Sequence, residues 1–127
     1  MKLIEAVNAY MAAQALSREK MPYATALAVV KVKRATSDLK DFFVEEERKL
    51  VEEYAARDED GRIRVNENGR FALRAGACAA DYEKARKELA ETETGAEGEK
   101  IRVRAPETIT PEQLEALAPW IEWEAEE

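Results

Sequence analysis

The chain contains no histidine and one cysteine, Cys78, in 127 residues. It therefore lacks the commonest general acid or base and the commonest metal ligand of proteins. This absence excludes the Ser-His-Asp and Cys-His arrangements of nucleophilic catalysis. A single cysteine forms no disulfide within the chain and no cysteine-rich zinc site, which favours a reducing compartment. We expect Cys78, which lies in an alanine-rich segment, to be a small buried apolar residue rather than a nucleophile.

Long apolar stretches are also missing. No segment approaches the roughly 20 apolar residues that a membrane-spanning helix needs. The first residues include Glu5 and Asn8, so they do not have the pattern of a signal peptide. We therefore expect a cytoplasmic protein that does not enter a membrane.

Bulky apolar residues are scarce, although the chain has the length of one domain. Leu, Ile, Val and Phe together make up 25 of the 127 residues, and alanine alone supplies 23. Alanine, glutamate, lysine and arginine are strong helix formers. The composition predicts a mostly helical α+β protein with a thin core, folded as a single domain over residues 1–127.

The first part of that domain, residues 1–57, is predicted to be a helical hairpin. Apolar residues recur at helical spacing over residues 2–16, and Pro22 starts a second helical segment that reaches Arg57 without Gly or another Pro. If straight, this second helix would be about 54 Å long, too long for a compact chain of this size. We expect it to bend or to be covered by a partner chain. Residues 36–38, Thr-Ser-Asp, are the expected break, because their side chains compete for backbone hydrogen bonds.

The second part, residues 58–127, is predicted to be a small α+β unit. Residues 62–65 alternate as a strand, and Asn68-Gly69 is a hairpin signal ahead of a returning arm with Phe71. We identify no internal repeat. The remaining expected elements are a helix over residues 77–91, a strand over 101–104, a short helix that begins at Thr110-Pro111 with a capping-box Gln113, and the segment 120–123.

These elements follow one another in a recognisable order: a paired N-terminal helix, a long helix with an acidic end, a glycine turn and a C-terminal strand-helix-strand unit. The residues that carry this order are Glu46, Arg48, Leu50, Tyr54, Asp60-Gly61, Thr110-Pro111, Leu114, Leu117 and Trp120 to Trp123. In this order the chain resembles small proteins of unknown function encoded by bacteriophages and prophages. The resemblance implies a phage or mobile-element context in a bacterial host cell, where small acidic proteins often act by binding host proteins. It implies no active site.

Charge is distributed in blocks along the chain, whose formal net charge is −7. Residues 35–60 hold four basic and ten acidic side chains, a net −6, and residues 91–127 hold three and eleven, a net −8. Residues 1–34 and 61–90 are mildly basic, at +4 and +3. Such alternation favours self-association or a basic partner over nucleic acid.

The acidic end of the second helix is the main candidate binding surface. Three consecutive acids point in different directions around a helix, so we expect no catalytic or metal-binding carboxylate pair. We predict a non-enzymatic protein without a cofactor, acting as a phage-type, anti-defence inhibitor that presents an acidic surface to a basic site on a host protein. A virion accessory protein is left open. The residues of this surface are Glu45, Glu46, Glu47, Glu52 and Glu53.

Four arginines around the expected hairpin suggest a different function, in which an oligomer sequesters a small anion such as a nucleotide signal. The alternative is that they form a solvated face paired with the acidic block. The chain has no recognisable nucleic-acid motif and is acidic overall, so we expect no direct nucleic-acid binding. These candidate anion-binding residues are Arg62, Arg64, Arg70 and Arg74.

Residues 56–67 partly match a calcium-binding EF-hand loop. Asp58, Asp60 and Glu67 fall at ligand positions, but the first ligand position is occupied by Ala56. The residues after Glu67 break a helix rather than start one. We therefore favour a helix-ending turn and expect no metal site.

Phe42, Phe43 and Val44 are consecutive on the expected second helix. Since successive residues of a helix point about 100° apart, the three side chains cannot all face one small core. We predict a homodimer or higher oligomer in which Phe42 or Phe43 crosses the interface. Of Trp120 and Trp123, we expect one in the core and the other as an interface anchor.

Overall fold

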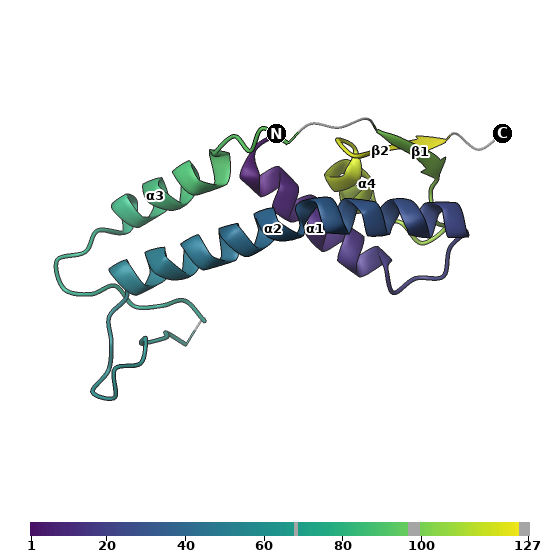
Figure 1. Cartoon of the computed structure of the whole chain (residues 1–127). Coiled ribbons are helices and arrows are strands. Elements are labelled where there is room, and N and C mark those ends of the chain that lie inside the picture. Colours follow the sequence, from purple (N-terminus) through teal and green to yellow (C-terminus); the bar gives the residue numbers. More distant parts are fainter. Residues whose placement is uncertain (68, 97–99, 125–127) are drawn as a thin grey trace.

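In the computed structural model, which describes residues 1–67, 69–96 and 100–124, helices dominate and one small sheet lies near the C-terminal end. Figure 1 shows an elongated molecule in which α1, α4 and the strands gather along one half of α2, while α3 follows the other half. The expectation of a mostly helical α+β fold with a long second helix is confirmed. The elements are α1 (Leu3–Leu16), α2 (Tyr23–Tyr54), α3 (Ala79–Glu91), β1 (Ile101–Arg104), α4 (Pro111–Leu117) and β2 (Ile121–Glu124).

The core lies between α1, the first half of α2, α4 and the sheet. Many of its buried positions are alanine, as the composition predicts, and several of these lie on α1. α1 is apolar around most of its circumference, which is typical of a helix covered on several sides. Among the described residues, no helix combines the length and the apolarity needed to cross a bilayer. The largest fully buried side chains are Leu3, Leu16, Val29, Val32, Leu117 and Ile121.

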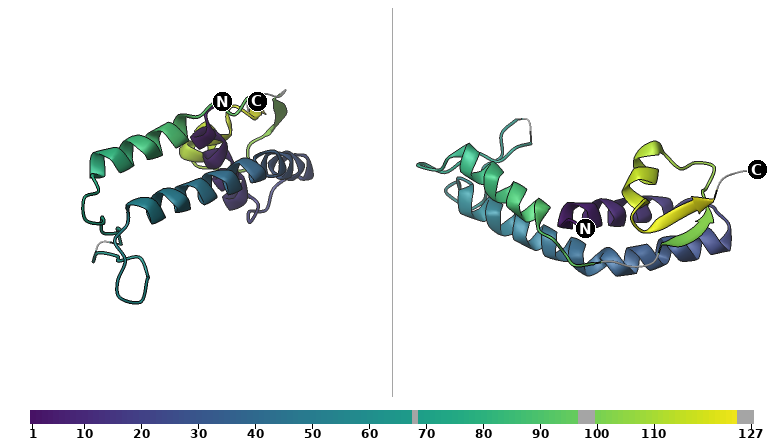
Figure 2. Two further views of the ribbon diagram at one scale, coloured as in Figure 1. Left: turned by 60° about the vertical axis from the view of Figure 1, so that its left-hand side comes forward. Right: turned by 90° about the horizontal axis from the view of Figure 1, so that it is seen from above.

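α2 is continuous from Tyr23 to Tyr54, so the predicted break at residues 36–38 is wrong. Thr36 is fully buried, and its hydroxyl donates a hydrogen bond of 2.8 Å to the Val32 carbonyl of the same helix. A threonine bonded in this way stays within the helix and favours a bend. Figure 2 shows α2 curved, with its concave side toward α1 and α4. The long helix therefore follows the core by curving, without a break.

The C-terminal unit is a parallel strand pair joined through α4. β1 and β2 pair in a register that sets Ile101 opposite Ile121. The predicted capping box at the start of α4 is confirmed. The Thr110 hydroxyl accepts from the Gln113 N–H at 3.2 Å, and the Gln113 side-chain oxygen accepts from the Thr110 N–H at 3.0 Å.

Trp120 and Trp123 are both half-buried and both pack against the core. Their indole N–H groups are buried, and neither has an acceptor among the described residues. We expected one tryptophan to be in the core and the other to be exposed, but the two side chains are buried to a similar extent. Their role in an interface stays a prediction.

Between α2 and α3 the backbone forms a closed ring of three short extended segments, residues 55–58, 62–65 and 71–74. The N–H of Ala56 donates to the Ala72 carbonyl at 2.7 Å. The N–H of Ala72 donates to Arg64 at 2.8 Å, and that of Arg64 donates back to Ala56 at 2.9 Å. The expected hairpin is therefore one edge of this three-sided ring.

The ring has an eight-residue period, which corrects the expectation of no internal repeat. Residues 58–63 have the sequence DEDGRI, and residues 66–71 have the sequence NENGRF. Gly61 and Gly69 close the two turns with φ values of +79° and +81°, and their N–H groups donate to the carbonyls three residues earlier. Each glycine therefore has the left-handed conformation that glycine adopts most easily. Asn68, the other residue of the expected turn signal, lies outside the described residues.

α3 lies against the second half of α2 with no buried residue of its own. Tyr82 packs edge-on against Tyr54 and Phe71, with ring centroids 5.7 and 4.9 Å apart. Cys78, just before α3, is exposed, so the expectation that it is buried is wrong. The reason is that Cys78 lies in the connection between the ring and α3, residues 74–78, where every residue except the half-buried Ala77 is exposed.

Candidate functional site

The acidic end of α2 is largely paired with basic side chains of the same protein. Four of the five predicted surface acids have such a partner, and the fifth, Glu53, is exposed. The surface therefore carries less uncompensated negative charge than the sequence suggests. The pairs are Glu45 and Glu52 with Arg48, Glu46 with Lys49, and Glu47 with Arg86 of α3.

The ion pairs on α2 also shift proton affinities. The hydrogen bond from Arg48 lowers the pKa of the Glu45 carboxyl, and the same contact raises the pKa of Arg48. The hydrogen bond to Asp41 raises the pKa of Lys40. Glu45, Arg48 and Asp41 are exposed and Lys40 is half-buried, and exposed ion pairs contribute little to stability. The pKa shifts therefore describe a solvated helix face rather than a catalytic site.

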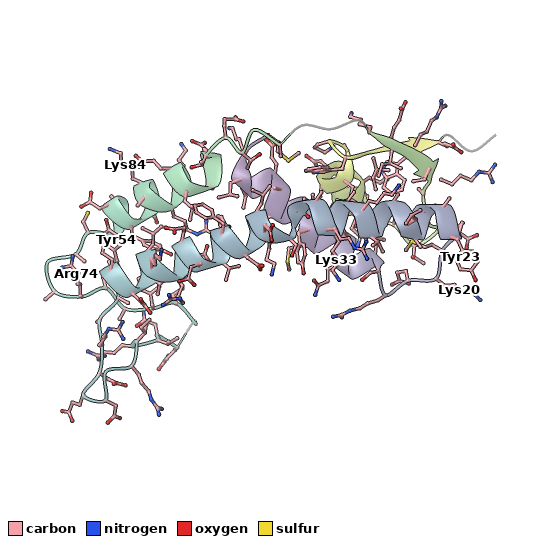
Figure 3. The ribbon with its side chains drawn as sticks, viewed as in Figure 1. Lys20, Tyr23, Lys33, Tyr54, Arg74 and Lys84 are labelled. Carbon is pink, nitrogen blue, oxygen red and sulfur yellow. The ribbon has the colours of Figure 1, made fainter. Side chains whose placement is uncertain are left out.

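The four candidate anion-binding arginines all lie on the ring between α2 and α3 and are all exposed. Arg74 donates from its side chain to the Glu53 carbonyl at 2.7 Å and so ties the ring to the end of α2. Arg57, which the sequence did not single out, donates to the Gly61 carbonyl at 2.7 Å. Two arginine side chains of the ring, Arg57 and Arg74, therefore bind backbone carbonyls of the protein itself. Figure 3 shows Arg74 and Tyr54 at the opposite end of the molecule from Tyr23 and Lys20.

The EF-hand-like segment is a turn in this ring. One carboxylate oxygen of Asp58 accepts the N–H groups of Asp60 and Arg62 at 2.9 and 3.0 Å, so it stabilises the turn itself. The chain continues from Gly69 in extended form, and the next helix begins only at Ala79. The segment is a turn, as expected, but it does not end the helix: α2 ends at Tyr54, and the turn follows the extended residues 55–57. Within the described ranges, no three His, Cys, Asp or Glu side chains are grouped as metal ligands.

An open groove of about 820 Å³ lies between α1 and α4. Five of its lining residues are apolar, and we call these five its floor: Met11, Ala12 and Ala15 of α1, Ala116 of α4, and Pro119 just after α4. Met11 is 57% exposed. The small alanine side chains leave room for a ligand to come close to both helices.

The other lining residues of the groove, which we call its rim, are polar: Asn8, Thr110 and Gln113 are uncharged, and three are acidic. Glu5 of α1 and Glu112 and Glu115 of α4 line it, and none of the three has an ion-pair partner in the part of the chain that the structure describes. No lysine or arginine is among its lining residues. The α1–α4 groove thus combines an apolar floor with uncompensated carboxylates.

The groove was not identified from the sequence because its floor and rim come from segments about 100 residues apart. Met11 is one of the apolar residues that recur at helical spacing over residues 2–16, a pattern typical of a buried helix face, but the structure exposes it. The sequence did contain one indication of these free acids. Glu112 and Glu115 belong to the acidic block 91–127, and few basic residues lie within one helical turn of them. The acids of α2, in contrast, have Arg48 and Lys49 within one helical turn.

A comparison of the chain with protein-family models, with curated proteins and with solved structures finds no match. The resemblance to small phage-encoded proteins therefore stays a prediction.

Proposed function

We propose that the protein is a non-enzymatic binding protein that holds a basic segment of a partner protein in the α1–α4 groove. The observation that carries this proposal is that five apolar residues line the groove together with Glu5, Glu112 and Glu115, and that no basic side chain is among its described lining residues. A segment with apolar side chains flanked by lysine or arginine complements both features. Complementary charge of this kind accelerates association and makes binding sensitive to salt.

The groove supports this function better than the acidic end of α2 does. On α2, Arg48, Lys49 and Arg86 already neutralise most of the nearby carboxylates. A basic partner would have to displace these bases to reach the carboxylates. In the groove the acids have no such competitors among the described residues.

The resemblance to phage-encoded proteins extends the proposal to a class of partner. In that context the partner is a bacterial host protein with a basic surface, and the chain acts as an inhibitor by occupying that surface. Basic surfaces of this kind often bind nucleic acid, so the inhibitor would compete with nucleic acid for its target.

The test begins by cross-linking the protein in a bacterial lysate, identifying the partner by mass spectrometry, and then measuring its affinity with purified proteins. We expect the Glu112→Lys/Glu115→Lys variant to bind at least tenfold more weakly. The control variant, Glu53→Lys/Glu59→Lys, changes the net charge by the same amount at exposed sites outside the groove. It is expected to bind like the wild type.

Equal affinities for the two double variants would contradict the groove proposal. A loss of binding only in the control would move the site to the acidic end of α2. A different result, in which a small anion co-purifies with the protein and is lost in the Arg62→Gln/Arg64→Gln variant, would favour the alternative function of sequestering a nucleotide. Native mass spectrometry distinguishes this last case.

A further inference from the structure

One side of α2 lies fully open and carries both apolar and charged residues. Leu27 and Phe42 are 55% and 51% exposed. In the view from above, α1 and α4 lie along the concave side of α2, and no described helix or strand lies along its convex side (Figure 2). We call this side the outer face of α2. Its members are Ala24, Leu27, Lys31, Arg34, Ala35, Asp38, Phe42 and Glu45, all exposed.

The members of the outer face lie on one side of the helix because of their spacing. Steps of three, four and seven residues return to the same side, at about 100° per residue. Val44, two residues after Phe42, points about 200° away from it. The outer face is therefore distinct from the side on which Val44 is exposed.

The outer face is complementary to a second copy of itself that runs in the opposite direction. Leu27 and Phe42 are equidistant from the midpoint between residues 34 and 35, and so are Lys31 and Asp38. Two copies placed antiparallel about that midpoint set Leu27 against Phe42 and Lys31 against Asp38. A two-fold axis produces each of these contacts twice.

We propose that two copies of this chain associate antiparallel through the outer face of α2, centred between Arg34 and Ala35. The pairing covers Leu27 and Phe42 and gives Asp38 a basic partner. Lys31, Arg34 and Asp38 form no ion pair within the described residues. A parallel pairing would instead set Lys31 against its own copy, and like charges in contact are unfavourable.

The convex shape of α2 limits this contact to the middle of the helix. Leu27 and Phe42 are about 22 Å apart along the axis, so the interface involves about four turns of each copy. Stable interfaces usually bury about 800 Å² on each partner, and a contact of this length between two helices buries less. The dimer is therefore concentration-dependent.

The dimer leaves the α1–α4 groove of each copy open, because the groove lies on the concave side of α2. Two grooves in one particle would engage a partner with two basic segments more tightly than a single groove does. The dimer itself does not depend on the proposed function of the groove. Its test measures mass alone and would stand if no basic partner were found.

The mass of the wild-type protein is measured by sedimentation equilibrium over a wide concentration range at low salt. We expect the mass to rise from that of the 14.3 kDa chain toward twice that value. Phe42→Glu abolishes this rise, whereas Val44→Glu, at a residue of similar exposure (54%), leaves it unchanged. A monomer at every concentration, or equal effects of the two variants, would overturn the proposal.

Charge reversal tests the antiparallel register. Lys31→Asp and Asp38→Lys each place like charges opposite one another, so each single variant stays monomeric. The double variant Lys31→Asp/Asp38→Lys restores the complementary pairs and the dimer. An equimolar mixture of the two single variants also forms a heterodimer. If neither the double variant nor the mixture recovers the dimer, the register is wrong.

Discussion

Thr25, near the start of α2, donates a hydrogen bond of 2.8 Å to the backbone carbonyl of Arg104, which lies 79 residues later at the end of β1. Thr25 is 1% exposed. This bond joins the two-stranded unit to the long helix. It matters because the chain as a whole has few bulky apolar residues for its core. It therefore links the N-terminal and C-terminal parts of the fold.

Replacing Thr25 by valine keeps its shape but removes the donor. The Arg104 carbonyl then loses its partner in a partly buried setting, and the free energy of unfolding falls by about 1–3 kcal/mol. Thr36→Val is the matched control, because the Thr36 hydroxyl donates to Val32 O, a carbonyl that the helix already engages. Its cost is below about 1 kcal/mol. Urea denaturation measures the free energy of unfolding of both variants. An equal decrease in the two would contradict the role given to Thr25.

The sequence predicted those parts of the fold that depend on neighbouring residues. The capping box of Thr110 and Gln113, the start of α2 after Pro22 and the alternation in β1 all act over a few residues. The expected break at residues 36–38 failed because burial of Thr36 against the core stabilises a continuous helix. Tertiary packing overrides local side-chain competition at that position.

The candidate sites were less predictable, because each depends on distant segments. Glu47 was expected to be a free surface acid, but α3 brings Arg86 to within 3.1 Å of it. Phe42 and Phe43 look equivalent in sequence, yet Phe43 is buried beneath Arg86 of α3 and only Phe42 offers surface to a partner. The groove floor at Met11 arises only when α4 packs across α1.

The capping box at α4 supports a second prediction. Thr110→Ala removes the acceptor for the Gln113 N–H and lowers the free energy of unfolding by about 1 kcal/mol. The loss appears in global unfolding because Leu117 of α4 is fully buried in the core. Thr110→Ser keeps a hydroxyl and retains most of the stability. Thermal denaturation followed by circular dichroism compares the three proteins, and an unchanged melting temperature in Thr110→Ala would refute the role of the cap.

The ring between α2 and α3 leads to a third prediction, concerning local stability. Gly61 has a φ of +79°, and a left-handed conformation costs other residues about 1–2 kcal/mol. Gly61→Ala therefore opens the ring more often and accelerates hydrogen exchange at the amides of Ala56, Arg64 and Ala72 by about tenfold. Gly95→Ala places a similar strain outside the ring and leaves these amides unchanged. Unaltered ring exchange in Gly61→Ala would show that the turn does not hold the ring together.

A fourth prediction concerns high pH and the packing of α3 on α2. Burial raises the pKa of the Tyr82 hydroxyl, and the Glu47 carboxylate raises it further. The folded state therefore favours the protonated phenol. Its contribution to stability is complete below about pH 10, the pKa of an unperturbed tyrosine, and is lost as the pH rises through the higher folded-state value. In a spectrophotometric titration at the tyrosinate band, the component that disappears in Tyr82→Phe is expected to titrate above about pH 10, the pKa of an unperturbed tyrosine. Glu47→Gln shifts the Tyr82 component to lower pH. If the Tyr82 component titrates at or below about pH 10, α3 does not pack on α2 through Tyr82 in solution.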